Sequence, residues 1–392
     1  MYWTRALAAQ IRRFDNTRLV TNGGMFMPRH LVDDGSNAGM GGPPMMRNPY
    51  LSPEAQAAAF AEMIDCLDIV SLNYSYQNYE KFSQLFPGKV LQGTETSGMD
   101  AWSNAQAVAG NSHVIGDFMW TAYDNLGEAG AGRSYWEPAK RFGLMADWPW
   151  MSCFQGDLAM DGTRLPRSYY RKVIWGLDDG AYLFTTHPSH TGQPLYGTGF
   201  HWHDVKKTWT FGSEWIGKPV DVEVYANCDE VEFFVNGVSA ARAQPEEMIA
   251  HALIPYQPGE LKIVAYRDGV AVAEDRVETT GAPERIRLVP EQTDLAADGM
   301  DLVYVACRLE DAAGRPVDWD DRELSAAVCG AGTLLGFGSN NPCTDENFGT
   351  GRRKTWNGTA MLVLRAARTP GNMTVTVTAP GLPAASLTLS VR

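Results

Sequence analysis

The spacing of hydrophobic positions changes once along this chain of 392 residues. Up to about residue 178, apolar side chains recur at helical spacing or stand in short continuous runs. Trp3, Leu7, Ile11 and Phe14 have the helical spacing and predict an amphipathic helix. Continuous runs, typical of buried strands, occupy residues 18–22, 67–73, 89–94 and 114–120. Because helical or loop segments separate the runs, we expect the second half of a (β/α)8 TIM barrel, strands five to eight.

Beyond about residue 180 the spacing becomes two, which indicates strands with one buried and one exposed face. Residues 220–224 alternate in this way, and Asn236-Gly237 and Asp268-Gly269 have the sequence of tight hairpin turns. A second alternating region begins after residue 283. We therefore expect two immunoglobulin-like β-sandwiches after the partial barrel. The expected domains are 1–178 for the partial barrel, 179–281 for a linker with the first sandwich, and 282–392 for the second sandwich.

Polar and aromatic side chains stand where two of the apolar runs end. Glu95 lies between two threonines at the end of the third run, and Trp120 ends the fourth run, followed by Asp124 and Glu128. A glutamate at such a position can also be a helix cap or a solvated loop residue. The carboxyl ends of parallel barrel strands form one rim, where active sites lie. The two neighbouring motifs together favour an active site.

These motifs resemble a known family. Segments 92–97 (QGTETS) and 116–128 (GDFMWTAYDNLGE) are similar to the catalytic half of glycoside hydrolase family 2, which includes β-galactosidases and β-glucuronidases. The two sandwiches, and segment 336–342 (GFGSNNP), resemble the C-terminal domains of that family. The resemblance implies that Glu95 is the nucleophile of a retaining glycosidase. It also implies that Trp120 lines the subsite of the reacting sugar.

The resemblance extends to other residues of the expected rim. Asn73 and Tyr74 match the position from which a tyrosine hydrogen-bonds the nucleophile, and Tyr76 is an alternative to Tyr74. Asp124 and Glu128 are expected to contact sugar hydroxyls or to support the residues that do so. A β-linked galactoside is the favoured substrate, while β-glucuronide and β-mannoside specificities remain open.

Retaining glycosidases need a second carboxyl group as the acid/base. In the family this group is a Glu that follows an Asn, and the sequence contains no Asn-Glu pair. Asp100, Asp124 and Glu128 are the carboxylates near strand ends that could replace it. We expect that the acid/base is absent together with the first half of the barrel, so the chain is a truncated or split enzyme. A catalytically inactive carbohydrate-binding or structural remnant is the alternative hypothesis.

Composition narrows the set of partners. The net charge is −13 and the pI is about 5.0, with no basic run, which argues against nucleic acid and anionic membrane surfaces. No apolar run approaches the roughly 20 residues that span a bilayer. The N-terminus lacks the pattern of a secretory signal, which favours a cytoplasmic location. Half a barrel exposes apolar strand edges, so a missing N-terminal half or a homo-oligomer is the expected protein partner.

Cysteine and histidine positions indicate neither a metal site nor a cofactor. Six cysteines without Cys-x-x-Cys spacing favour reduced thiols, with a Cys307–Cys329 bridge as the alternative. Four histidines gather between the partial barrel and the first sandwich, but their spacing does not supply the converging ligands of a metal site. These are His187, His190, His201 and His203.

Overall fold

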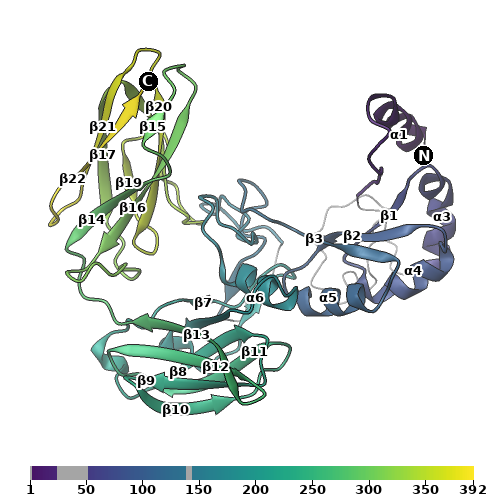
Figure 1. The fold of residues 1–392 in the computed structure, drawn as a ribbon, viewed down its shortest axis with the longest axis horizontal. Coiled ribbons are helices and arrows are strands. Elements are labelled where there is room, and N and C mark those ends of the chain that lie inside the picture. Colours follow the sequence, from purple (N-terminus) through teal and green to yellow (C-terminus); the bar gives the residue numbers. More distant parts are fainter. Residues whose placement is uncertain (1, 24–51, 138–143) are drawn as a thin grey trace.

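The computed structural model describes residues 2–23, 52–137 and 144–392. Figure 1 shows three bodies in succession: a part with helices and a small sheet near the N-terminus, a β-sandwich, and a second β-sandwich that ends at the C-terminus. Strands predominate and helices are few.

The first body contains a three-stranded parallel sheet in the order β1-β2-β3. Helices pack on the sheet, and Val70, Leu72 and Leu91 are fully buried between the strands and the helices. The elements are α1 (Tyr2–Phe14), α3 (Pro53–Asp65), β1 (Ile69–Asn73), η2 (Tyr76–Asn78), α4 (Tyr79–Leu85), β2 (Val90–Thr96), α5 (Ala101–Ala109), β3 (Val114–Met119), β4 (Ser134–Tyr135) and α6 (Pro166–Ile174).

The strand predicted at residues 18–22 is wrong. The carbonyl of Val20 accepts hydrogen bonds from the backbone nitrogens of Asp68 and Ile69, but no ladder extends from this point. The backbone nitrogen of Val20 donates instead to the carboxylate of Asp68 at 2.8 Å. A side-chain acceptor has therefore taken the place of a strand partner, and the described sheet has three strands.

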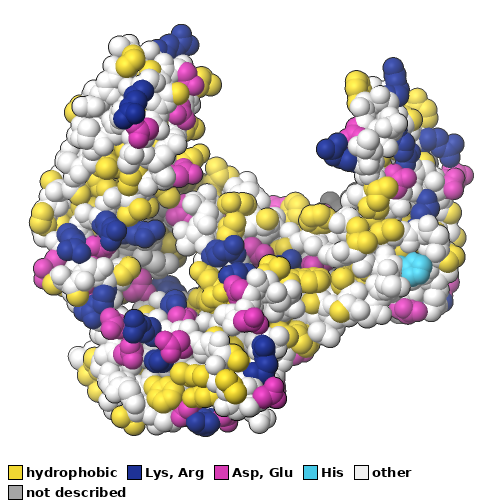
Figure 2. All heavy atoms as spheres, in the orientation of Figure 1, with side chains coloured by type: hydrophobic (Ala, Val, Ile, Leu, Met, Phe, Trp, Pro, Cys, Tyr) yellow, Lys and Arg dark blue, Asp and Glu magenta, His cyan; other side chains and the backbone are white. Residues whose placement is uncertain are grey.

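The predicted first helix forms, but its apolar side chains are exposed in the described part of the chain. Trp3, Leu7, Ile11 and Phe14 are 72%, 58%, 48% and 84% exposed, whereas Ala8 is buried. Figure 2 shows hydrophobic side chains on the surface of the body that contains this helix. Helical spacing predicts the secondary structure correctly here, but it does not predict whether the apolar face of the helix is buried.

The first sandwich consists of two four-stranded sheets, in the orders β11-β8-β5-β7 and β10-β9-β12-β13. Trp209, Phe233 and Ile263 are fully buried between these sheets. The elements are β5 (Ala181–Thr186), η3 (Pro188–His190), β6 (Tyr196–Gly197), β7 (Val205–Lys206), η4 (Ser213–Trp215), β8 (Pro219–Ala226), β9 (Glu230–Val235), β10 (Val238–Ala243), β11 (Ile249–Pro255), β12 (Glu260–Arg267) and β13 (Val270–Glu278).

Both predicted hairpin turns are confirmed. Asn236 and Gly237 connect β9 to β10 with φ values of 50° and 81°. Asp268 and Gly269 connect β12 to β13 with φ values of 52° and 75°. A tight turn with positive φ at both central positions matches the twist of the flanking strands and favours Asn-Gly and Asp-Gly.

The second sandwich pairs a four-stranded sheet, β14-β16-β20-β18, with a five-stranded sheet, β15-β22-β21-β17-β19. Its buried core includes Phe337, Leu362 and Val375. The elements are β14 (Arg285–Pro290), β15 (Asp294–Leu295), β16 (Leu302–Glu310), β17 (Glu323–Gly330), β18 (Gly332–Gly338), β19 (Arg352–Lys354), β20 (Thr359–Ala366), β21 (Gly371–Thr378) and β22 (Ala385–Val391).

All six cysteines are free, so the Cys307–Cys329 bridge does not form. Within the described ranges, none of the helices has the length and hydropathy needed to cross a membrane.

The first body and the first sandwich share a small core in which Tyr170 and Val173 of α6 pack with Phe184 and Tyr225. The shared core joins α6 to the first sandwich.

A fully buried arginine organises the loop between β18 and β19. Arg353 donates to the carbonyl of Phe337 at 3.1 Å and to the carboxylate of Glu346 at 3.2 Å. Its guanidinium also lies 4.3 Å from the ring centroid of Phe348. Three parts of the sandwich are thereby held by one side chain.

We expect Arg353→Met to destabilise the second sandwich by about 3 kcal/mol, because it leaves a carbonyl and a carboxylate without their buried partner. Arg352→Met is the matched control, since the neighbouring side chain is exposed. Calorimetric unfolding of the two variants measures the difference. An equal decrease in the free energy of unfolding in both variants would show that the buried contacts of Arg353 do not stabilise the sandwich more than an exposed arginine does.

Candidate functional site

Glu95 stands at the carboxyl end of β2, next to the ends of β1 and β3. The parallel register places Asn73 of β1 opposite Glu95. The backbone nitrogen of Trp120, which follows β3, donates to the carbonyl of Thr96 at 3.0 Å. Gly93 allows this arrangement, because a Cβ there would collide with the hydroxyl of Tyr79. The strand ends therefore bring the three motifs together at one rim.

Tyr74 orients the candidate nucleophile. Its hydroxyl donates to Oε2 of Glu95 at 3.0 Å, and its backbone nitrogen donates to the carbonyl of Glu95 at 2.7 Å. The ring is only 9% exposed. Burial, and then the charge of Glu95, raise the pKa of Tyr74 well above its usual value. Tyr74 thus remains a proton donor toward the carboxylate, whereas Tyr76 begins the next short helix.

Trp120 and Glu128 form a second group beside Tyr74. The indole nitrogen of Trp120 donates to Oε2 of Glu128 at 3.2 Å, and the amide of Gln155 donates to the same oxygen at 2.9 Å. The charge of Glu128 also contributes to the raised pKa of Tyr74, after burial and Glu95. Glu128 therefore fixes the plane of the Trp120 indole and lies within electrostatic reach of the Tyr74 hydroxyl.

Asp124 and Asn73 hold the surrounding backbone and side chains. Oδ1 of Asp124 accepts from the backbone nitrogen of Gly156 at 2.7 Å and from the thiol of Cys153 at 3.4 Å. Asp124 is 8% exposed, and burial raises the pKa of its carboxyl. Asn73 accepts from the hydroxyl of Thr94 at 2.6 Å. These contacts give Asp124 a role in shaping the loop after Trp120.

Sequence reasoning missed a cluster of ion pairs behind the rim. Arg171 of α6 pairs with Asp117 of β3 and with Asp157 of the following loop, both at 3.2 Å. Asp117 also accepts from the hydroxyl of Thr96 at 2.7 Å. Arg167, one turn earlier in α6, is 3% exposed and lies 3.5 Å from Asp157. Helical spacing of the two arginines was the only local signal for this cluster.

The histidines between the bodies do not converge. His203 contacts Glu223 at 2.9 Å, and the ring of His190 stacks on Trp136 at 4.4 Å. Among the described residues, no three His, Cys, Asp or Glu side chains are grouped so that they could hold a metal ion.

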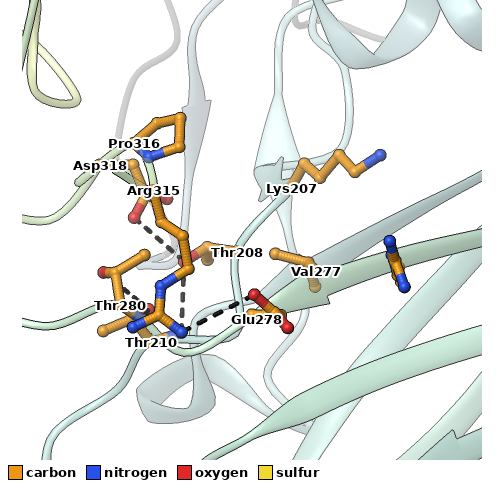
Figure 3. A pocket seen from close by; sticks show the side chains of 10 residues that line it. Lys207, Thr208, Thr210, Val277, Glu278, Thr280, Arg315, Pro316 and Asp318 are labelled. Atoms are coloured by element: carbon orange, nitrogen blue, oxygen red, sulfur yellow. Dashed lines mark hydrogen bonds and ion pairs between the residues drawn. The ribbon is translucent and has the colours of Figure 1, made fainter. Parts of the chain in front are cut away.

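Two cavities among the described residues lie apart from Glu95, although Asp124 lines the larger of the two. One of about 700 Å³ is lined by residues of all three bodies, including Arg167, Trp202 and Trp356. Another of about 370 Å³ lies where the two sandwiches meet. Figure 3 shows Arg315 reaching toward Glu278 at its wall. Glu95 lines neither of these two cavities, so its position at the end of β2 is what identifies the candidate site.

Known proteins are similar to this chain. Residues 286–388 match the model of glycoside hydrolase family 2 C-terminal domain 5, and residues 217–273 match a domain of unknown function, DUF4982. Beta-galactosidase BoGH2A of Bacteroides ovatus is 29% identical over 297 residues, which cover 74% of this chain and 30% of that protein. A putative beta-glucuronidase of Formosa agariphila is 25% identical over 232 residues, covering 58% of this chain and 19% of that protein.

A solved structure extends the similarity. A glycosyl hydrolase family 2 member from Bacteroides cellulosilyticus aligns with a TM-score of 0.82 at 28% identity, covering 99% of this chain and 47% of that chain. The chain therefore spans less than half the length of these relatives. It is related to proteins of the glycosidase class. Within that class it is similar to the C-terminal portion of glycoside hydrolase family 2, which confirms the resemblance recognised from the sequence.

We expect Tyr74 to remain protonated above about pH 11, where an ordinary tyrosine with a pKa near 10 is ionised. The raised pKa means that the folded protein holds the Tyr74 proton more tightly than the unfolded chain does. The contribution of protonated Tyr74 to the free energy of unfolding is therefore complete below about pH 10 and is lost as the pH rises further. Titration of ¹³Cζ-labelled tyrosines by NMR, with Tyr74→Phe to assign the resonance, measures this. A Tyr74 signal that titrates near pH 10 would contradict the geometry.

Proposed function

We propose that the chain carries the nucleophile half of a retaining glycoside hydrolase site. The observation that supports this most directly is the placement of Glu95 at the end of a parallel strand, with the Tyr74 hydroxyl on its Oε2. We further propose that β1, β2 and β3 belong to a (β/α)8 barrel and that the two sandwiches are immunoglobulin-like.

In this mechanism, Oε1 or Oε2 of Glu95 attacks the anomeric carbon and the bond to the leaving oxygen breaks. The leaving oxygen takes a proton from a second carboxylic acid. Water, deprotonated by that same group, then attacks the anomeric carbon and releases Glu95. Tyr74 keeps the attacking carboxylate in one orientation. The indole of Trp120, held by Glu128, offers an apolar wall for the sugar's C–H face.

The acid/base is proposed to come from another segment. The three local carboxylates have other positions or partners. Asp100 is the N-cap residue of α5, Oε2 of Glu128 already accepts two hydrogen bonds, and Asp124 is buried in its own loop. β1 and β3 are the edges of the described sheet. Ile115 and Phe118 on β3 are each 59% exposed. We propose that further barrel strands pack against these edges and bring the second carboxyl group to the rim.

A β-galactoside is the proposed substrate, because a relative that aligns over 74% of this chain is named a beta-galactosidase. The Formosa relative makes a β-glucuronide the next candidate. A sugar-binding protein without catalysis is a second candidate function, and the absence of an Asn-Glu pair from the sequence favours it. Covalent labelling of Glu95 distinguishes a reactive site from a binding remnant.

A 2-fluoro galactoside with a dinitrophenyl leaving group should label Glu95 in the 392-residue chain, because such a leaving group needs no proton. Peptide mapping by mass spectrometry identifies the modified residue. Glu95→Gln should abolish labelling, while Glu128→Gln, the matched carboxylate control, should retain it. Modification of Asp124 or Glu128 instead would overturn the assignment.

The rate should also depend strongly on the leaving group. Without general acid catalysis, turnover of unactivated sugars should be slower by a factor of about 10² to 10⁴. Rates on aryl galactosides whose phenols differ in acidity, compared with the rate on lactose, measure this dependence. Hydrolysis of lactose at a rate close to that of the activated glycosides would show that an acid/base lies within these 392 residues.

A further inference from the structure

Three consecutive residues from the segment that leads into the first sandwich contact the ends of β1 and β2 and the loop that follows β3. Thr198, Gly199 and Phe200, here called the linker tripeptide, follow β6 and precede β7. Each contacts a different part of the rim: the loop after β3, the end of β2 and the end of β1. The sequence alone suggested no more than a Gly- and Thr-rich connection at this position.

The contact at β1 involves the residue that orients Glu95. The ring of Phe200 meets the ring of Tyr74 edge to face, with centroids 5.5 Å apart and planes inclined by 73°. Aromatic rings favour this arrangement because the positive edge of one ring meets the negative face of the other. Tyr74 has few ways to move: Phe200 packs on the ring while Glu95 accepts from the hydroxyl.

The contact at β2 lies two residues beyond Glu95. The hydroxyl of Ser97, which is 5% exposed, donates to the carbonyl of Gly199 at 2.5 Å. A buried hydroxyl paired with one carbonyl fixes the position of both backbones. The end of β2 is therefore bonded directly to the linker tripeptide.

The third contact involves the loop that follows Trp120. The hydroxyl of Thr198 donates to the carbonyl of Ala131, which is 2% exposed. Next to it, β4 pairs with β6 through Ser134 opposite Gly197. Arg167 supports the other side of the tripeptide, since its guanidinium donates to the carbonyl of Phe200 at 3.4 Å.

We propose that the linker tripeptide is a positioning element of the candidate site, and that Phe200 acts on Glu95 through Tyr74. This inference rests on the proposed glycosidase function. It extends the functional unit beyond the expected boundary at residue 178, because a segment that follows this boundary contacts the ends of β1 and β2 and the loop after β3. Phe200 itself is a positioning residue and takes no part in bond making.

The first experiment tests the contact without requiring activity. In Phe200→Ala, the ¹³Cζ resonance of Tyr74 should shift and should titrate closer to pH 10, because the ring loses its cover. Phe200→Tyr retains a ring and should restore the titration seen in the unmodified chain. Gly88→Ala is the control outside the linker tripeptide: Gly88 lies in the turn before β2, and an added Cβ there meets nothing within 4 Å. An unchanged Tyr74 titration in Phe200→Ala would overturn the proposal.

The second experiment asks whether the contact serves Glu95. With the activated 2-fluoro galactoside, Phe200→Ala should label at least tenfold more slowly at saturating reagent, while the concentration for half-maximal rate changes little. Gly88→Ala, outside the linker tripeptide, should label within twofold of the unmodified rate. Phe200→Leu keeps an apolar side chain but has no ring edge, so its labelling rate should resemble that of Phe200→Ala. The leucine variant replaces the alanine variant if the latter folds poorly.

A double-mutant cycle separates positioning from a general structural effect. If Phe200 acts through Tyr74, the Phe200→Ala and Tyr74→Phe changes together should slow labelling no more than Tyr74→Phe alone. Losses that multiply would show that Phe200 acts independently of Tyr74 and would overturn the inference. Failure of the unmodified chain to label Glu95 would instead count against the proposed function, while the NMR titration still decides whether Phe200 holds Tyr74.

Discussion

Two arginines of α6 hold together the parts of the molecule that surround Glu95. Arg171 pairs with Asp117 on β3 and with Asp157 on the loop that follows, and Arg167 joins that loop to the linker. Burial raises the pKa of Asp157 and lowers that of Arg167 to about 10, so these charges are poorly solvated. A buried ion pair adds little net stability, but loss of one partner costs about 3 to 5 kcal/mol. The cluster therefore selects one arrangement of sheet, loop and linker.

The small parallel sheet also determines how the candidate site is built, because the site lies at the ends of its strands. Parallel sheets are usually covered on both faces, and exposed strand edges invite pairing with other strands. Here β1 and β3 are edges, and apolar side chains of β3 and α1 face solvent. Within the described part of the chain, the ion pairs of α6 and the contacts of the linker tripeptide hold the strand ends in place.

The residues around the candidate site come from more than one body of the molecule. The first sandwich has its own core, yet α6 shares a second core with it and the linker reaches the strand ends. A site assembled in this way depends on how the bodies are joined as well as on its own residues.

Short-range features were predictable from the sequence because their causes are local. Helical spacing predicted α1, alternation predicted the sandwich strands, and Asn236-Gly237 predicted a hairpin since few other residues adopt positive φ there. Glu95 alone could have been a helix cap or a loop residue; the motif around it was recognisable because the motif around Trp120 follows on the next strand and the two together resemble a known family. The same reasoning failed at Val20, where the side chain of Asp68 captured the backbone nitrogen.

Only the tertiary structure decided which groups meet. Tyr74 and Tyr76 were equivalent by sequence, and the choice of Tyr74 depends on the register between β1 and β2. Phe200 lies more than a hundred residues from Glu95 along the chain, with no periodicity to connect them. Hydrophobic and turn patterns describe interactions between neighbours in sequence. The orientation of a carboxylate depends on residues brought to it from distant segments, and it is set only when those segments pack.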